Sequence, residues 1–370
     1  MRGSYRLFHL CALAVLFPVT AQADHPAGVF GSGGGPINFV SAGTMEEGAW
    51  TAGARVEYLG FDRFSDDELV ALAGAGSEPD SIDFSFGTFV SVAYGLTDWL
   101  TVSARLPHAY QDDIREPEDI GAGVFEVENE GHTSGLADIL FLGVVKLWET
   151  DAQDVQISAI VGLEIPSGRT NDLTREGDLF ELEHQPGSGS WDPLVGLAVS
   201  RSWDRWSFHA NGYYWFITEG RQDTGLGDIV GYNAGVVYRL CGHEHGHEHS
   251  HGCGHEHDGC HGHSCGCHDA GHEHGHDHCH CHHGCDHGHH GPTLDLVLEL
   301  NGTWQDMHVV GVDPDENSGG HLLLLSPGLQ LTLHEHWSVY TSVGVPIVQD
   351  LNGANHELDI RLVLGTSWSF

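Results

Sequence analysis

The feature that most constrains this chain is an alternation of apolar and polar residues that recurs in long segments. Residues 50–58 place an apolar side chain at every second position, and residues 82–94 and 358–365 repeat the pattern. Successive side chains of a β-strand point to opposite faces, so the pattern predicts strands with one apolar and one polar face. No uninterrupted apolar run in the chain reaches the ~18 to 20 residues that a spanning helix needs. We therefore expect an all-β protein that, if it lives in a membrane, crosses it with strands.

Twelve such segments can be delimited along the chain. Most are about 12 to 15 residues long, which exceeds the ~5 or 6 residues usual in soluble sheets and suffices for a tilted membrane strand of ~9 to 11. The segments are residues 48–61, 81–94, 99–111, 135–148, 154–166, 191–202, 206–218, 227–240, 293–306, 320–334, 337–349 and 356–370. Bacterial single-chain barrels have an even number of strands. The sequence thus predicts a transmembrane antiparallel β-barrel of about 12 strands.

The connections between these segments also alternate. Short turns are expected at residues 96–98, 150–153, 204–205 and 335–336. Most of the others are longer and acidic, at residues 62–80, 112–134, 167–190 and 307–319. Aromatic residues flank the short turns, as an interfacial girdle requires: Tyr94, Trp99, Trp148, Trp203, Trp206 and Trp337. Short periplasmic turns opposite long outer loops are typical of outer-membrane barrels.

Charged residues are expected on the inner face of the barrel. They are Arg55, Glu57, Arg105, Glu164, Arg239, Asp295, Glu299, Asp359 and Arg361. Buried charges are costly unless they are paired or hydrated. A lumen lined by charges of both signs meets that condition, whether ion pairs close it or water fills it. The pattern therefore does not decide whether the barrel conducts.

The two ends of the chain indicate export. Arg2 and Arg6 precede an apolar run over residues 7–19, and Ala21-Gln22-Ala23 is a small-x-small cleavage site. This is the layout of a secretory signal peptide, which we assign to residues 1–23. The glycine-rich residues 24–47 are expected to form a tail or a plug.

The chain ends on Phe370, which closes an alternating segment. A terminal aromatic resembles the signal recognised by the outer-membrane assembly machinery, so that machinery is an expected partner and the Gram-negative outer membrane the expected location. The alternative is a soluble, secreted β-sandwich that ends in Phe by chance. The long strands and the alternating connections favour the barrel.

The charge of the chain is strongly negative. Fourteen Lys and Arg against 53 Asp and Glu give a formal net charge of −39, which excludes nucleic acid as an expected partner. The acids cluster in the long connections, where solvated loop ends are the simpler interpretation. Binding of divalent ions at the lipopolysaccharide surface is the alternative.

Between Cys241 and Gly291 the composition changes abruptly: 20 His, 8 Cys, 8 Asp or Glu and 12 Gly occur in 51 residues. The remaining cysteine is Cys11 in the signal, so this is not a disulfide scaffold. Such a stretch cannot bury a core, and we expect it to be disordered without a ligand. It divides the barrel into residues 48–240, with eight strands, and 292–370, with four.

Imidazole and thiolate are ligands preferred by Zn²⁺, Cu and Ni²⁺. Repeated His-acid-His units and paired cysteines predict several weak, exchangeable sites, with Zn²⁺ as the expected ion and Cu or Ni as alternatives. The candidate ligands are His243, His245, His247, His249, His251, Cys253, His255, His257, Cys260, His261, His263, Cys265, Cys267, His268, His272, His274, His276, His278, Cys279, His280, Cys281, His282, His283, Cys285, His287, His289 and His290. A repeat expansion without function is the alternative. Because eight strands precede the segment, strand parity places it in the periplasm.

No motif for catalysis stands out. The sequence has no Gly-x-Ser-x-Gly elbow and no finger-type zinc spacing, and no lysine follows the glycines at 31–35 as a phosphate loop requires. We therefore expect no enzymatic activity.

Several short motifs resemble one family. They are His25-Pro26-Ala27-Gly28, the stretch from Tyr94 to Val102 with Leu106-Pro107, Leu163 to Gly168, and the aromatic terminus. On these residues the chain resembles the predicted outer-membrane transporters named after the meta-pathway of phenol degradation. The resemblance covers most of residues 24–370 except the histidine-rich segment. It implies a β-barrel and permits a role in metal resistance. The 51-residue insertion departs from the short turn that is usual there, which puts an aromatic substrate in doubt and favours metal.

The function predicted from the sequence is an outer-membrane transporter or porin-like barrel that binds transition-metal ions through a periplasmic loop. It would serve metal export, uptake or buffering, with a periplasmic efflux system as a candidate partner. The alternatives are a non-conducting barrel that anchors a metal-binding segment, and a channel for small aromatic or hydrophobic compounds. A soluble periplasmic metallochaperone is a further alternative.

Overall fold

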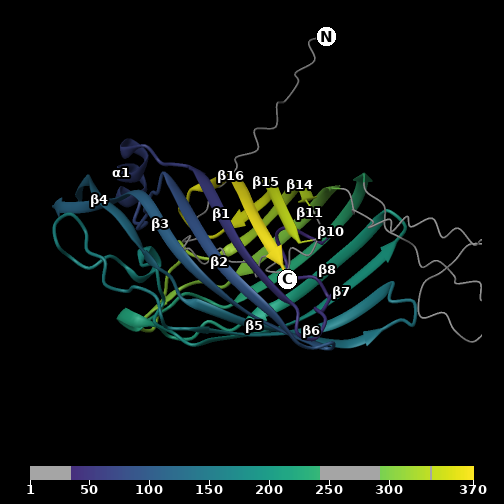
Figure 1. Ribbon diagram of the computed structural model, residues 1–370. Helices are drawn as coiled ribbons and strands as arrows, with labels where there is room; N and C mark the ends of the chain where they lie inside the picture. The colour runs from purple at the N-terminus through teal and green to yellow at the C-terminus, as the bar shows by residue number, and fades with distance from the viewer. Residues whose placement is uncertain (1–34, 242–291, 334–335) are drawn as a thin grey trace, which may run out of the picture.

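The computed structural model describes residues 35–241, 292–333 and 336–370. Most of them lie in strands of one antiparallel sheet that closes on itself (Figure 1). The barrel strands are β1 (Trp50–Asp62), β2 (Phe84–Thr97), β3 (Leu100–Gly121), β5 (Ile139–Glu149), β6 (Val155–Ile165), β7 (Asp192–Trp203), β8 (Trp206–Trp215), β10 (Ile229–Cys241), β11 (Thr293–Gln305), β14 (Gly320–Leu333), β15 (Trp337–Leu351) and β16 (Glu357–Ser369). Each pairs with its neighbours in chain order, and β1 pairs with β16. The predicted barrel of about 12 strands is confirmed.

The long connections gather at one end of the barrel and carry the remaining elements. They are α1 (Asp66–Gly74), β4 (Val124–Leu136), η1 (Leu182–His184), η2 (Arg221–Asp223), β9 (Thr224–Gly225), β12 (Val309–Val310) and β13 (Asp313–Pro314). In Figure 1 this end lies on the left, with α1 and β4, and the short turns lie on the right. No helix among the described residues is long and apolar enough to cross a membrane.

The connection over residues 112–134 differs from its expected form as a loop. Instead β3 continues to Gly121 and pairs with β4 in a hairpin that extends beyond the ring of barrel strands. Gly121, Ala122 and Gly123 all have positive φ, and this conformation allows the chain to reverse in a tight turn.

The helix α1 was also not expected. Ser65 accepts a hydrogen bond from the backbone N–H of Glu68, and Glu68 in turn accepts one from the Ser65 N–H. This capping box satisfies two backbone donors at the start of the helix. Leu69 and Ala73 are its buried residues.

The two faces of the barrel wall differ as the alternation predicts. Apolar side chains such as Val90, Leu197, Leu298 and Leu364 are exposed on the outer face, where they suit lipid. Exposed tryptophans follow the short-turn end, at positions 50, 99, 148, 203, 206, 337 and 368. They form the girdle that a membrane interface favours.

The inner face carries most of the predicted charges in buried positions, with one correction. Asp359 is exposed rather than inward-facing. The pairing of β1 with β16 matches Gly60 to Ile360 and then Phe61 to Leu358, which skips Asp359. The extra residue is a β-bulge, and it reverses the facing of the side chains that precede it.

Candidate functional site

The most informative site is the lumen, because a segment of the chain lies inside it. Residues 35–48 precede β1, and within them Ile37, Phe39, Val40 and Ala42 are buried against the inner wall. Twelve strands enclose more space than wall side chains fill, since about eight strands is the size at which they just do so. Residues 24–47 were interpreted as a tail or a plug, and the part described here occupies the lumen.

A layer of charged side chains contacts the start of this segment, at Ile37 and Asn38. Arg55 Nη2 lies 2.8 Å from Glu57 Oε2, and Arg361 Nε lies 2.6 Å from Glu57 Oε1. Glu299 accepts hydrogen bonds from the backbone N–H of Ile37 at 2.5 Å and from Asn38 Nδ2 at 2.6 Å. All these charged side chains are buried and each has a charged or hydrogen-bonding partner, which meets the condition for burial.

An asparagine ladder continues the polar wall across β8, β10 and β11. Asn233 donates to Asn211 at 2.9 Å, Asn301 donates to Asn233 at 3.1 Å, and Ser326 donates to Asn301 at 2.7 Å. The ladder reaches the lumen segment because Asn211 Nδ2 donates to the carbonyl of Val40 at 2.8 Å. Polar side chains of the wall therefore hold the segment by hydrogen bonds.

The lumen wall also carries an apolar cluster, most of which lies on β5 to β8 among buried polar residues such as Ser158, Ser200 and Asn211. Val40 and Ala42 of the segment pack in one cluster with inward side chains of these strands and of their neighbours. The cluster contains Ala93, Leu140, Leu142, Val144, Ile160, Leu194, Ala198, Tyr213, Trp215 and Ile229. Trp215 is buried, and its indole N–H makes no hydrogen bond with any residue that the structure describes. The lumen wall therefore combines an apolar cluster with polar side chains, and residues 35–48 contact both.

The segment leaves the lumen at the short-turn end. The N–H of Met45 donates to Thr101 Oγ1 at 2.7 Å, and the N–H of Gly48 donates to the carbonyl of Gly95 at 2.8 Å. A Cβ on Gly95 would lie 1.9 Å from the carbonyl oxygen of Glu46, so only glycine lets the segment cross β2 here.

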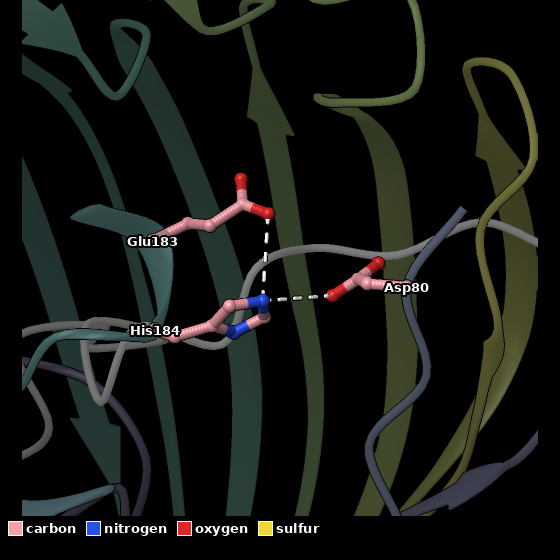
Figure 2. A group of neighbouring side chains, drawn as sticks. All are labelled: Asp80, Glu183 and His184. Carbon is pink, nitrogen blue, oxygen red and sulfur yellow. Dashed lines mark ion pairs between the residues drawn. The ribbon is translucent and has the colours of Figure 1, made fainter. Parts of the chain in front are cut away.

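At the opposite end, the long connections bring histidines and carboxylates together. His184 of η1 is fully buried, and its Nε2 lies 3.2 Å from Asp80 Oδ2, 3.5 Å from Glu116 Oε1 and 3.7 Å from Glu183 Oε1. Figure 2 shows the carboxylates of Asp80 and Glu183 reaching the same imidazole nitrogen from two different directions. Despite these distances, neither ring nitrogen of His184 makes a hydrogen bond with a described residue. We call Asp80, Glu116, Glu183 and His184 the mouth cluster.

Neighbouring residues surround the mouth cluster. His308 Nδ1 lies 3.1 Å from Glu183 Oε2 and can donate a hydrogen bond to it. Asp315 lies close to both residues. Gln185 fixes the preceding loop, because its amide donates to the carbonyls of Asp172 and Phe180. The cluster is thus held in place by a hydrogen-bonded framework.

Electrostatics at this end follow from burial and from crowding of carboxylates. Burial alone lowers the pKa of His184, but the adjacent Asp80, Glu116 and Glu183 outweigh it and raise that pKa well above its ordinary value. Burial, together with Glu183 and Glu116, raises the pKa of Glu181 to about 7. Within the described chain, the ion-pair partners of Asp80 and Glu183 are histidines only.

The predicted metal ligands, from His243 to His290, lie outside the described residues. The strands that flank them are described: Cys241 ends β10, is exposed, and pairs with Leu294 of β11. Arg205, in a short turn, accepts a hydrogen bond at its carbonyl from the N–H of Arg239. The insertion therefore joins β10 and β11 at the short-turn end.

Comparisons with known proteins agree with this architecture. The sequence model of a family described as "Putative MetA-pathway of phenol degradation" matches residues 77–246, which confirms the resemblance seen in the sequence. No significant match was found among curated protein sequences.

Solved structures with a similar fold include an outer-membrane channel from Pseudomonas putida F1. It has 13% sequence identity and a TM-score of 0.51, and the match covers 89% of this chain and 98% of that one. The NanC porin matches with 8% identity and a TM-score of 0.40, over 86% of this chain and 98% of that one. The CymD monoaromatic hydrocarbon channel matches with 8% identity and a TM-score of 0.38, over 88% of this chain and 89% of that one. At these identities the first match supports the fold, and the fold is that of a Gram-negative outer-membrane barrel.

Proposed function

From an outer-membrane barrel that resembles the phenol-degradation family, we propose a channel for small, mainly apolar solutes of the aromatic class. In the conformation described, residues 35–48 lie inside the lumen, and closure of the lumen by this segment is part of the proposal. We therefore favour a channel for aromatic compounds over metal transport through the lumen. This channel is one of the alternatives that the sequence leaves open.

The observation that carries the proposal is the apolar cluster in the lumen wall. Leu140, Leu142 and Ile160 belong to this cluster, and the asparagine ladder supplies polar groups to the same lumen. Binding sites for small ligands are mostly apolar with a few placed polar groups. Trp215 supplies such a group, because its buried N–H has no partner in the described chain and can donate to a phenolic oxygen.

The contacts that hold residues 35–48 support a segment that can move out of the lumen. Its backbone at Ile37, Asn38, Val40 and Ala42 bonds to side chains of the wall. These contacts are not part of the strand ladder, so the segment can leave without breaking the sheet. Its departure would uncover the apolar cluster in which Val40 and Ala42 pack.

The histidine-rich segment remains a separate proposal based on composition. We propose that residues 243–290 bind Zn²⁺, or Cu or Ni, at several exchangeable sites on the periplasmic side. Its attachment to β10 and β11 at the short-turn end supports this placement, since short turns face the periplasm in barrels of this type. Contacts with lipopolysaccharide, the assembly machinery and an efflux system stay predictions.

The channel proposal is tested by solute block of ion current in planar bilayers. The full-length Asn38→Ala variant is used because it weakens the hold on the segment. We expect phenol to block the current more strongly than inositol, a polar solute with a ring of similar size. Leu142→Asn should weaken the phenol block, whereas Leu142→Met should keep it.

Two results would contradict the proposal. One is equal block by phenol and inositol, which would remove the aromatic preference. The other is an absence of current in every variant that assembles correctly. Heat-modifiable migration on gels checks that each variant is a folded barrel.

A further inference from the structure

The mouth cluster is independent of the predicted histidine-rich ligands and lies at the other end of the barrel. We propose that Asp80, Glu183 and His184 bind a divalent transition-metal ion, with Glu116 as a further oxygen donor. The site is assembled from two connections and the extended strand β3, which are distant in the sequence.

The spacing of the donor atoms supports this assignment. Ligand atoms about 2.1 Å from a tetrahedral ion lie about 3.4 Å from one another. His184 Nε2 is 3.2, 3.5 and 3.7 Å from the oxygens of Asp80, Glu116 and Glu183. The donor atoms of Asp80, Glu183 and His184 all lie within 4.8 Å of one another.

The unsatisfied imidazole is a second, independent observation. A buried polar group without a hydrogen bond costs free energy. His184 is fully buried and points its Nε2 at the carboxylates, which lie at ion-pair distances (Figure 2). Neither of its ring nitrogens has a partner in hydrogen-bond geometry among the described residues. An ion bound to Nε2 displaces the proton from that nitrogen and neutralises the carboxylates around it.

The surroundings fit a metal ligand set. His308 Nδ1 lies 3.1 Å from the Glu183 oxygen that does not face His184. A hydrogen bond of this kind orients a ligating carboxylate. Gln185 and Gln222 both donate to the carbonyl of Phe180, which fixes the loop that carries the ligands.

The donor set indicates the class of ion. Two or three carboxylates with one imidazole suit Mn²⁺, Fe²⁺ or Zn²⁺, whereas Cu⁺ prefers sulfur ligands. An ion here would link residue 80, the β6–β7 connection and β3 across the mouth of the barrel.

The test uses Mn²⁺, because oxygen-rich sites bind it well and thiolate-rich sites prefer other ions. The full-length protein is titrated while the EPR signal of free Mn²⁺ is followed. We expect wild type to remove one more equivalent than His184→Gln or Asp80→Asn. The matched control is His132→Gln, since His132 is an exposed histidine at the same end of the barrel. His308→Ala should weaken binding by about 10- to 100-fold.

A local measurement on the wild-type protein keeps the test independent of variant folding. Mn²⁺ should slow hydrogen exchange in residues 167–190, and His132→Gln should leave that effect unchanged. No Mn²⁺-dependent protection in wild type, or equal Mn²⁺ uptake by wild type and His184→Gln, overturns the proposal. Either outcome leaves the channel proposal standing, because the lumen walls do not depend on this site.

Discussion

Arg361 on the last strand places its Nε 2.6 Å from Glu57 Oε1 on the first strand, so a buried ion pair bridges the seam where the barrel closes. The same carboxylate pairs with Arg55, whose Nη1 donates to the carbonyl of Ile37. One residue thereby links closure of the sheet to retention of the lumen segment.

This link predicts a large effect of a small change. Glu57→Gln leaves Arg361 and Arg55 buried without their charged partner, and removing one partner of a buried pair costs on the order of 3 kcal/mol. Urea unfolding in lipid vesicles should show the loss. Glu126→Gln, a change at an exposed carboxylate of β4, should leave the unfolding free energy unchanged. Equal unfolding curves for wild type and Glu57→Gln would mean that the pair adds nothing to closure.

The β3–β4 hairpin should respond to pH through Glu128. A hydrogen bond to Glu176, followed by burial and the charge of Glu176, raises the pKa of Glu128 to about 7 from 4.5. The folded hairpin then binds more protons than the unfolded chain between these values, so its stability falls as the pH rises from about 4.5 through about 7. Glu128→Gln should therefore slow hydrogen exchange in the hairpin at pH 8 and have little effect at pH 4. A stabilisation that is equal at both pH values would contradict this account.

The insertion should be separable from the barrel. Joining Leu240 to Pro292 through a short Gly/Asn linker should leave a folded, heat-modifiable barrel, because turns tolerate changes in length. Wild type should bind at most roughly seven to nine Zn²⁺ ions, and the deletion variant should bind fewer. The Zn²⁺ lost on deletion should be the Zn²⁺ that wild type releases between pH 7.5 and 5.5, since imidazole has a pKa of ~6.5. Unchanged metal content in the deletion would place the ligands elsewhere.

The side of the membrane can be checked with a protease tag near Ser264. The insertion follows an even number of barrel strands and joins β10 to β11 at the short-turn end. The tag should resist protease in intact cells and be cut once the outer membrane is permeabilised. Cleavage in intact cells would reverse the orientation.

The sequence predicts the barrel well because each of its strands carries its own period-two signal, as in residues 82–94. The hairpin at Gly121–Gly123 and the capping box at Ser65 also have local signals, but they lie in acidic stretches that resemble irregular loops. The bulge at Asp359 has no local signal, since its effect on facing comes from pairing with β1.

The sites were less predictable for a physical reason. Asp80 and His184 are brought to 3.2 Å by tertiary packing of two loops, and no spacing in the sequence encodes that contact. The glycine-rich start of the chain suggests either a tail or a plug. Long-range bonds to the wall, such as those of Ile37 and Asn38 to Glu299, place it inside the lumen.

The central claim is that residues 35–48 close a lumen that conducts once they move. The most direct measurement is single-channel conductance of the full-length protein in planar bilayers, with wild type compared to the Asn38→Ala, Glu299→Gln double variant. These changes remove the hydrogen bonds that Asn38 donates to Glu299 and Ser342. We predict longer or more frequent open states in the double variant, with no such change in Glu126→Gln. Identical, closed behaviour of wild type and a correctly folded double variant would contradict the claim.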